Sequence, residues 1–315
     1  MERKKIIILG GGQTAAYAAK EIRSIDITSD VTIISEEKFL PYERPPLSKD
    51  YILDKVNFDN LLFFSETFYE ENKINFIVNT QIKKADFINK KISDSNKDFY
   101  YDKLLIATGS SNRHLVISGK KILPSNNIIY LRNFEESYYL KNRIEKAKNI
   151  SIIGGGFIGL EIASSASQKG KKITIFEKGS QLMGRIVPLE IAKLIQKKHE
   201  DVGTKIHLNV NIDSIKINKD LLHIYHSNNQ ELRSDLIVIG VGSEPNTKIF
   251  ENTSLKIENG VVTNEFCETS IEDVYAAGDV SNFYHPFYNL YMRLESYKHA
   301  QNHGINAGKN LIGNK

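Results

Sequence analysis

Two glycine-rich turns lie about half the chain apart, and each follows an apolar run typical of a buried strand. Residues 10–15 read G-x-G-x-x-A and residues 154–159 read G-x-G-x-x-G. In such a turn the first glycine permits a tight bend, the second lets the backbone approach a pyrophosphate, and the third position packs the helix on the strand. The pyrophosphate then lies at the helix N-terminus, where unbonded N–H groups favour an anion. Two turns predict two bound dinucleotides, and therefore electron transfer between two cofactors.

A carboxylate at the end of the strand after each turn is the expected partner of an adenosine ribose. After the first turn this is Glu36, 36 − 10 = 26 residues beyond Gly10, slightly more than the ~20 residues of the usual fingerprint. Its neighbour Glu37 is the alternative. After the second turn it is Glu177, 177 − 154 = 23 residues beyond Gly154.

Glu177 also bears on the choice between NADH and NADPH. A carboxylate accepts hydrogen bonds from a ribose but repels a 2′-phosphate, which an arginine normally accommodates. The sequence therefore predicts NADH rather than NADPH, while Lys178 and Arg185 are nearby cations that favour the opposite choice.

Each glycine turn belongs to a repeat of strand, helix and strand, which is a βαβ unit. The expected elements are residues 5–9, 13–24 and 31–34 in the first repeat and residues 150–153, 157–168 and 173–176 in the second. The pattern predicts an α/β fold with two Rossmann-like dinucleotide-binding domains, the second inserted in the first. The chain is expected to cross between the domains near residues 112 and 243, so the first domain is assigned residues 1–112 and 244–315, and the second residues 113–243.

Composition fits an ordinary globular protein, with 41% hydrophobic and 25% charged residues. The sequence contains no 18-residue apolar run and no signal-peptide pattern after MERKK, so we expect a cytoplasmic protein without a membrane span. The net charge of +4 favours an acidic partner, but no basic block indicates nucleic acid. The single cysteine, Cys267, excludes an internal disulfide and a CxxxxC redox pair.

The histidines do not form a recognisable metal-binding pattern. His223 and His226 alternate on a strand-like run, and His299 and His303 have i, i+4 spacing without an evident third ligand. The sequence therefore predicts no metal site.

Residues 41–52, PYERPPLSKDYI, are very similar to a stretch after the first βαβ unit in one group of FAD-dependent NADH reductases. That group includes the ferredoxin, rubredoxin and putidaredoxin reductases of bacterial oxygenase systems and apoptosis-inducing factor. YYDKLLIATGS, GGGFIGLEIA, VYAAGDV and RLESYKHAQNHG are in register, so the resemblance spans essentially the whole chain, and RPPLSK is its most discriminating part. It implies a glutathione-reductase-like fold with FAD on the first domain and NAD on the inserted one.

The resemblance also implies which residues bind the cofactors. Arg44 and Lys49 would contact the flavin and its ribityl-phosphate chain, Asp279 a ribityl hydroxyl, Arg132 the flavin cofactor, and Tyr297 would lie beside the isoalloxazine. The expected FAD residues are Gly10, Gly12, Gln13, Thr14, Ala15, Glu36, Arg44, Lys49, Ile82 (through its backbone, at the adenine), Ala107, Thr108, Gly109, Arg132, Gly278, Asp279 and Tyr297. The expected NAD residues are Gly154, Gly156, Phe157, Ile158, Gly159, Glu161, Glu177, Arg185 and Gly242.

Lys49 and Glu161 are the expected catalytic pair. In the similar reductases the matching lysine and glutamate meet beside flavin N5, where the two domains join. A fixed ammonium favours the reduced flavin, because reduction places negative charge on the ring, and the carboxylate keeps that ammonium in place. The implied reaction is hydride transfer from nicotinamide C4 to flavin N5, followed by one-electron transfer to a small acidic iron–sulfur carrier, ferredoxin or rubredoxin.

The sequence departs from the resembled group at its end, because the similar reductases continue for about another domain. We therefore expect the C-terminal reductase domain to be absent. A cysteine-dependent NADH oxidase, peroxidase or coenzyme A disulfide reductase is disfavoured, because it needs a reactive cysteine in EEKFLPYERP, which has none. The remaining alternatives are a flavoprotein without a dedicated ferredoxin partner, either NADH oxidase-like or like apoptosis-inducing factor, and a dinucleotide-binding module without redox activity.

Overall fold

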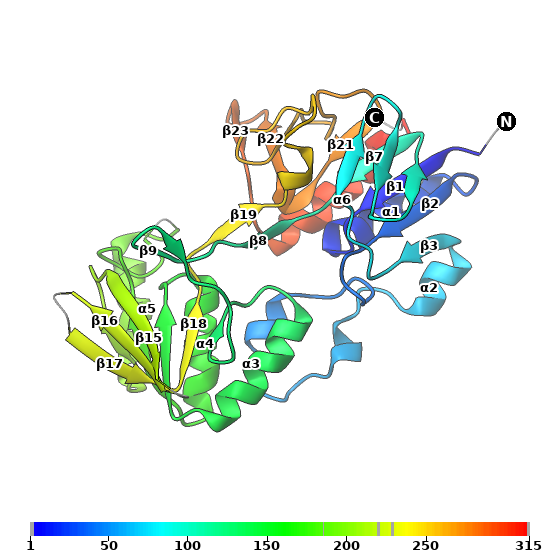
Figure 1. The fold of residues 1–315 in the computed structure, drawn as a ribbon. Helices are drawn as coiled ribbons and strands as arrows, with labels where there is room; N and C mark the ends of the chain where they lie inside the picture. The colour runs from blue at the N-terminus through cyan, green and yellow to red at the C-terminus, as the bar shows by residue number, and fades with distance from the viewer. Residues whose placement is uncertain (1–2, 185, 219–220, 228–229, 314–315) are drawn as a thin grey trace. The chain divides into compact units, whose positions relative to one another are not determined.

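The computed structural model describes residues 3–184, 186–218, 221–227 and 230–313. The chain forms two compact units (Figure 1). Unit 1 contains residues 1–43, 62–111 and 244–315, and unit 2 contains residues 44–61 and 112–243. Each unit has its own sheet and its own apolar core.

Unit 1 contains, among the described residues, a parallel sheet of five strands. The run KIIIL of its central strand is buried on both faces, as parallel sheets covered by helices require. In spatial order the strands are β21 (Val274–Ala276), β7 (Lys103–Ile106), β1 (Lys5–Leu9), β2 (Asp30–Ile34) and β3 (Ile74–Ile77). Its helices are α1 (Gln13–Ile25), α2 (Glu66–Glu71) and α6 (Tyr297–Leu311).

Two smaller sheets and two short 3₁₀ helices complete unit 1. The antiparallel sheet is β4 (Lys84–Asp86), β5 (Lys91–Ser93) and β6 (Asp98–Tyr100). The mixed sheet is β20 (Val261–Thr263), β22 (Ser281–His285) and β23 (Leu290–Met292), and the 3₁₀ helices are η3 (Lys248–Phe250) and η4 (Gly278–Val280).

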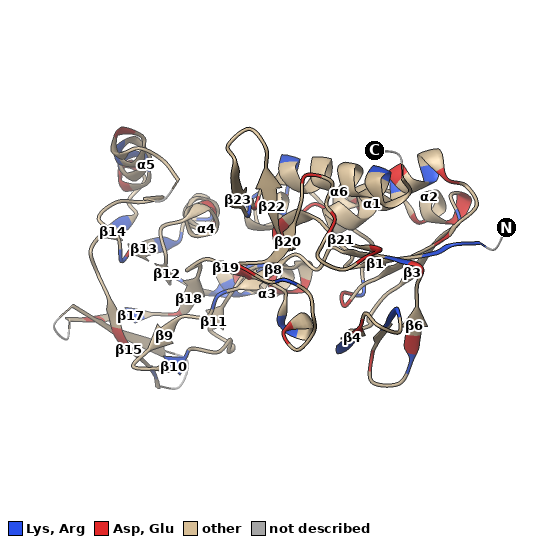
Figure 2. Ribbon diagram, turned by 90° about the horizontal axis from the view of Figure 1, so that it is seen from above, with Lys and Arg blue, Asp and Glu red and all other residues tan. Residues whose placement is uncertain are grey.

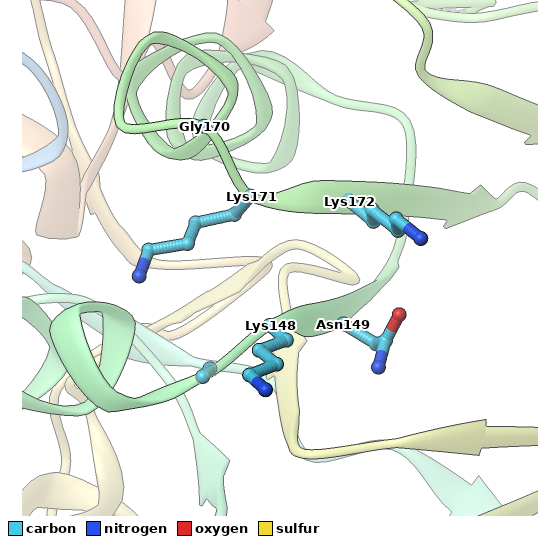
Figure 3. Close-up of a pocket in the computed structure, with 6 residues that line it drawn as sticks. Lys148, Asn149, Gly170, Lys171 and Lys172 are labelled. Carbon is cyan, nitrogen blue, oxygen red and sulfur yellow. The ribbon is translucent and has the colours of Figure 1, made fainter.

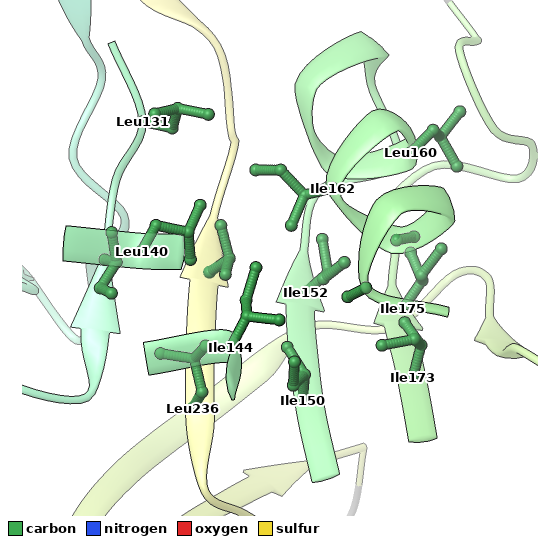
Figure 4. Packing of buried hydrophobic residues seen from close by; sticks show 14 of the residues in the cluster. Leu131, Leu140, Ile144, Ile150, Ile152, Leu160, Ile162, Ile173, Ile175 and Leu236 are labelled. Atoms are coloured by element: carbon green, nitrogen blue, oxygen red, sulfur yellow. The ribbon is translucent and has the colours of Figure 1, made fainter. Parts of the chain in front are cut away.

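Unit 2 repeats the arrangement of unit 1, with a parallel sheet of five strands among its described residues. In spatial order these are β11 (Ile128–Ile129), β18 (Leu236–Ile239), β12 (Asn149–Ile153), β13 (Lys172–Phe176) and β14 (Lys205–His207). Its helices are α3 (Phe134–Lys146), α4 (Phe157–Gln168) and α5 (Leu189–Asp201). Leucine and isoleucine side chains of α3 and α4 fill the space over β18, β12 and β13 (Figure 4).

The remaining strands of unit 2 form an antiparallel sheet and a short hairpin. One further pair of strands lies where the chain passes between the two units. The sheet is β15 (Ile212–Asn218), β16 (Leu221–His226) and β17 (Gln230–Ser234), and the hairpin is β9 (Val116–Ile117) and β10 (Lys120–Lys121). The crossings run through β8 (Ser110–Asn112) and β19 (Ser243–Pro245).

These elements confirm the predicted α/β fold. The predicted helix at 157–168 coincides with α4, and the predicted strands differ from β1, β2, β12 and β13 by at most one residue at an end. The reason is that each element has a clear sequence pattern. The strands are short apolar runs buried on both faces, and the helices have small or apolar residues on one face.

The segment 44–61 packs in unit 2, although the predicted first domain includes it. It contains the 3₁₀ helices η1 (Pro45–Ser48) and η2 (Phe58–Leu61). Buried hydroxyls of α3 and α4 hold it, because Ser137 donates to the Leu47 carbonyl at 2.6 Å and Ser165 to the Ser48 carbonyl at 2.8 Å. Ile52 adds a fully buried side chain to the core of unit 2.

Helices α1 and α6 approach each other unusually closely through glycine. A Cβ atom at Gly304 would overlap the carbonyl oxygen of Thr14, and one at Gly308 would lie 2.8 Å from the carbonyl oxygen of Ala18. Both contacts are with backbone, which cannot move aside. Small residues at this contact are therefore a condition for packing α1 against α6.

We expect Gly304→Ala to lower the free energy of unfolding by about 2–3 kcal/mol, because the added methyl group forces the helices apart. Asn302→Ala, at an exposed position of the same helix, should change it by less than about 0.5 kcal/mol. Urea denaturation followed by circular dichroism measures both. A gain in stability of about 1 kcal/mol, as for glycine to alanine in an ordinary helix, would contradict the close contact.

Candidate functional site

The first glycine turn connects β1 to α1. Gly10 has φ +119°, and a Cβ atom there would overlap the Ala107 carbonyl oxygen, so only glycine fits. Gly12, in contrast, has an extended backbone, and a Cβ atom there would meet no described atom within 4 Å. The third position, Ala15, is completely buried. The packing of the described chain thus does not require glycine at position 12, and the open side of the turn fits an approaching ligand.

The second turn repeats this geometry between β12 and α4. Gly154 has φ +108°, and a Cβ atom there would overlap the Gly240 carbonyl oxygen. A Cβ atom at Gly159 would overlap the Gly154 carbonyl oxygen. At Gly156 a Cβ atom would again meet no described atom within 4 Å.

The N-termini of these two helices differ from those of α2, α3 and α6, while α5 also lacks a side-chain cap but has Glu190 in its first turn. Side chains of Ser65, Asn133 and Ser296 cap α2, α3 and α6. Within the described residues no side chain caps α1 or α4, and neither has an acidic residue in its first turn. The missing caps, together with the open space at Gly12 and Gly156, fit an anion such as a pyrophosphate at these two helix starts.

The predicted ribose carboxylates are held differently in the two units. In unit 2, Glu177 accepts hydrogen bonds from the N–H groups of Gly155 and Gly179 at 2.7 and 2.6 Å, one at each carboxylate oxygen. The carboxylate is therefore fixed beside the glycine turn. Arg185, the predicted cation near it, lies outside the described residues.

In unit 1, Glu36 lies exposed beyond the end of β2 and accepts a hydrogen bond from Gln81 at 2.8 Å. The alternative, Glu37, accepts a hydrogen bond from the Tyr42 hydroxyl. Ile82 follows Gln81, and its side chain is buried in the core of unit 1.

Lys49 and Glu161 form an ion pair of 2.7 Å within unit 2. Their side chains are 41% and 25% exposed, so both groups remain accessible. The Ser48 hydroxyl donates to the second oxygen of Glu161 at 2.5 Å, an interaction that the sequence reasoning missed. Its only signal was the position of Ser48 before the lysine of RPPLSK.

Two predicted flavin residues, Arg44 and Arg132, meet in unit 2. The Arg44 guanidinium donates to the Arg132 carbonyl at 2.6 Å, and the Arg132 N–H donates to Glu136 at 2.6 Å. The predicted FAD residues are therefore divided, since Arg44, Lys49 and Arg132 belong to unit 2 and the others to unit 1.

In unit 1 the turn after β7 is tied to the chain at Asn246. Thr108 donates to the Asn246 carbonyl at 2.9 Å, and the Asn246 side chain donates back to the Thr108 carbonyl at 2.8 Å. Gly109 takes φ +68° in this turn. Ser110 then donates to the Asp279 carboxylate at 3.3 Å. Sequence reasoning missed Asn246, whose partner is 138 residues away.

Tyr297 and Gln13, both predicted at the flavin, also lie together in unit 1. The Gln13 side chain donates to the Tyr297 carbonyl at 3.0 Å, and the Tyr297 hydroxyl donates to Glu43 at 2.7 Å. Burial and the bond to Glu43 raise the pKa of Tyr297, so the phenol stays protonated. Glu43 was not among the predicted residues.

The other predicted NAD residues lie at the carboxyl ends of the strands of unit 2. Phe157 and Ile158 are exposed on the first turn of α4. Gly242 has φ +113° just beyond β18. Carboxyl ends are where open α/β sheets bind nucleotides.

Lysines stand at or beside the amino ends of β12, β13 and β14, at the opposite end of these strands (Figure 2). Lys148, Lys171 and Lys172 line a pocket there together with Asn149 and Gly170 (Figure 3). The Lys171 ammonium donates to the Glu145 carbonyl at 2.8 Å. This pocket is separate from the glycine turn.

The described residues include no cluster of three histidine, cysteine or acidic side chains suited to a metal ion. Among the described helices none is long and apolar enough to cross a membrane. Burial raises the pKa of the Cys267 thiol to about 12, so this cysteine is not a thiolate nucleophile at neutral pH.

Residues 4–304 match the family model described as pyridine nucleotide-disulphide oxidoreductase. This chain belongs to that family. The resemblance seen in the sequence is thereby confirmed. The residues present fit two dinucleotides, because each unit has an uncapped helix facing open space at its second glycine.

Similar proteins cover almost the whole oxidoreductase. Rubredoxin-NAD(+) reductase of Ectopseudomonas oleovorans is 31% identical over 310 residues, which are 98% of this chain and 80% of that protein. The ferredoxin–NAD(+) reductase component of a 3-phenylpropionate/cinnamic acid dioxygenase from Photorhabdus laumondii is 30% identical, over 99% of this chain and 79% of its own.

A solved structure gives the same result. The ferredoxin reductase for the CYP199A2 system from Rhodopseudomonas palustris superposes with a TM-score of 0.92 at 29% identity, covering 99% of this chain and 76% of that one. The covalent putidaredoxin reductase–putidaredoxin complex has a TM-score of 0.95 at 24% identity and supports the fold.

We expect Gly12→Ala to leave the apoprotein as stable as the parent, because its Cβ would point into open space, while dinucleotide binding weakens about tenfold or more as the methyl group displaces the pyrophosphate. Gly10→Ala should instead destabilise the fold itself, since its backbone is left-handed and its Cβ would overlap Ala107. Thermal denaturation of the apoproteins and titration with FAD measure the two effects. Equal behaviour of the two variants would contradict the distinction.

Proposed function

We propose that this oxidoreductase holds FAD on unit 1 and NADH on unit 2, and passes electrons on to a small iron–sulfur carrier, a ferredoxin or rubredoxin. The observation that carries the proposal is the repeated cradle, an uncapped helix N-terminus behind an open glycine, once in each unit. When bound, FAD accepts a hydride from NADH and returns electrons singly.

Unit 1 supplies the groups that bind FAD in this proposal. The N–H groups at the start of α1 take the pyrophosphate and the Glu36 carboxylate takes the adenosine ribose. Asp279 receives a ribityl hydroxyl, and Tyr297 covers the ring with its phenol directed at Glu43. The predicted flavin roles of Arg44 and Arg132 remain part of the proposal.

Unit 2 supplies the groups that bind NADH. The start of α4 takes the pyrophosphate, and Glu177 accepts hydrogen bonds from the adenosine ribose. Because two backbone N–H groups fix the Glu177 carboxylate, it cannot turn away from a 2′-phosphate. NADPH would therefore bind against a fixed negative charge, so we propose NADH as the reductant.

Lys49 and Glu161 are proposed to act by electrostatics. Glu161 is fixed at both oxygens, by the Lys49 ammonium and the Ser48 hydroxyl, so the positive charge stays in one place. A fixed cation stabilises the negative charge that arrives with a hydride, without any proton transfer by the protein. The side chains orient the reactants, and none acts as a general acid or base.

The carrier in this proposal is acidic. The relatives are named as reductases with rubredoxin or ferredoxin, and the net charge of +4 of this chain favours a partner of opposite charge. We place the reaction in the cytoplasm, where NADH is available. Cysteine-based peroxide or disulfide reduction is not proposed, because Cys267 is buried.

The test is steady-state NADH oxidation by the purified, FAD-loaded protein with a panel of acceptors: several ferredoxins, a rubredoxin, ferricyanide and oxygen. We expect one iron–sulfur carrier to be reduced much faster than oxygen, and NADH to be preferred over NADPH in kcat/KM. A colourless protein that cannot be reconstituted with FAD would overturn the proposal. A long-lived reduced protein that no carrier reoxidises would favour a function like that of apoptosis-inducing factor.

We expect Lys49→Met to slow flavin reduction by NADH about tenfold to a hundredfold, since one charge-assisted interaction is lost, while FAD stays bound. Stopped-flow absorbance of the flavin measures the rate. Lys55→Met is the matched control, because Lys55 is exposed and only 3.9 Å from Asp50 in a weak surface pair. An unchanged rate in Lys49→Met would remove the role assigned to Lys49.

A further inference from the structure

The turn of residues 277–279 in unit 1 is held by a histidine of α6. The N–H of Gly278 donates to Nδ1 of His303 at 3.1 Å, and both groups are buried. Gly278 takes φ +78°, and a Cβ atom there would overlap the Thr14 hydroxyl. Gly278 is therefore fixed from two sides, by a hydrogen bond and by close packing, immediately before Asp279.

His303 is built to accept this hydrogen bond. His303 is only 7% exposed. The centroid of its ring lies 5.1 Å from that of the Phe283 ring and 4.6 Å from that of the His299 ring. Burial lowers the pKa of His303 to about 3, so the ring is neutral at physiological pH. A neutral ring that accepts at Nδ1 carries its proton on Nε2.

The same cluster includes the first turn of α1. The Thr14 hydroxyl donates to the Ala300 carbonyl at 3.1 Å, and Gly304, next to His303, packs against the Thr14 carbonyl. Helix α6 thus binds the uncapped start of α1 on one side and the turn before Asp279 on the other.

We propose that His303 is a positioning residue for the flavin cofactor, which it never touches: by holding the Gly278 N–H it fixes Asp279 relative to the start of α1. The inference rests on the proposed function, in which α1 takes the pyrophosphate of FAD and Asp279 its ribityl chain. Both contacts are made by one ligand, so their spacing must match it, and His303 sets that spacing.

The test compares two substitutions of nearly equal shape. His303→Asn keeps a hydrogen-bond acceptor at the position of Nδ1, whereas His303→Leu has the same branching and no acceptor. Both lose the ring, so both should be destabilised to a similar extent in urea denaturation of the apoprotein. We expect the Kd for FAD, measured by flavin fluorescence, to rise about fivefold to tenfold more in His303→Leu than in His303→Asn.

A double-mutant cycle decides whether the effect runs through Asp279. In an Asp279→Ala background, the difference between His303→Leu and His303→Asn should disappear, because the group that His303 positions is gone. A difference of the same size in both backgrounds, or equal Kd values for the two His303 variants, would overturn the inference while leaving the proposed function intact. Failure of the parent apoprotein to bind FAD would overturn the proposed function itself.

Discussion

A helix that begins without a side-chain cap leaves backbone N–H groups that require an acceptor. The two glycine turns create that condition twice in this chain, at the starts of α1 and α4. Much of the surrounding structure keeps those positions open. Gly10 and Gly154 bend away through backbone angles open to few other residues, and the Gly304 and Gly308 contacts place α1 against its neighbours without large side chains.

Two carboxylates of unit 2, Glu177 and Glu161, illustrate two ways of fixing a charge. Glu177 is held by the backbone alone, through the N–H groups of Gly155 and Gly179. Glu161 is held by side chains, through Lys49 and Ser48. The first arrangement fixes the negative charge of Glu177 beside the glycine turn. The second fixes the positive charge of Lys49, whose side chain is more exposed than the Glu161 carboxylate paired with it.

Local patterns were sufficient to predict the fold and the positions of both glycine turns. The apolar run of β1 and the small and apolar residues of the helix at 157–168 are patterns contained within a few residues of sequence. The glycine spacing likewise predicts the geometry of each turn from neighbouring residues alone. Interactions across long sequence separations carry no such signal. Three hydrogen bonds join distant segments: Ser137 to the Leu47 carbonyl across 90 residues, Tyr297 to Glu43 across 254, and Thr108 to the Asn246 carbonyl across 138. For this reason the placement of residues 44–61 in unit 2 could not be read from the sequence.

The membership of residues 44–61 in unit 2 has a consequence for how the polypeptide matures. The chain passes from one unit to the other four times, after residues 43, 61, 111 and 243. Unit 1 is completed only by β21 and α6, near the end of the chain, and the core of unit 2 needs Ile52 from near its beginning. Every segment of unit 2 is therefore synthesised before β21 and α6, so unit 2 can be completed first while unit 1 is still incomplete. The early segments must wait, with apolar surface exposed, until their distant partners leave the ribosome.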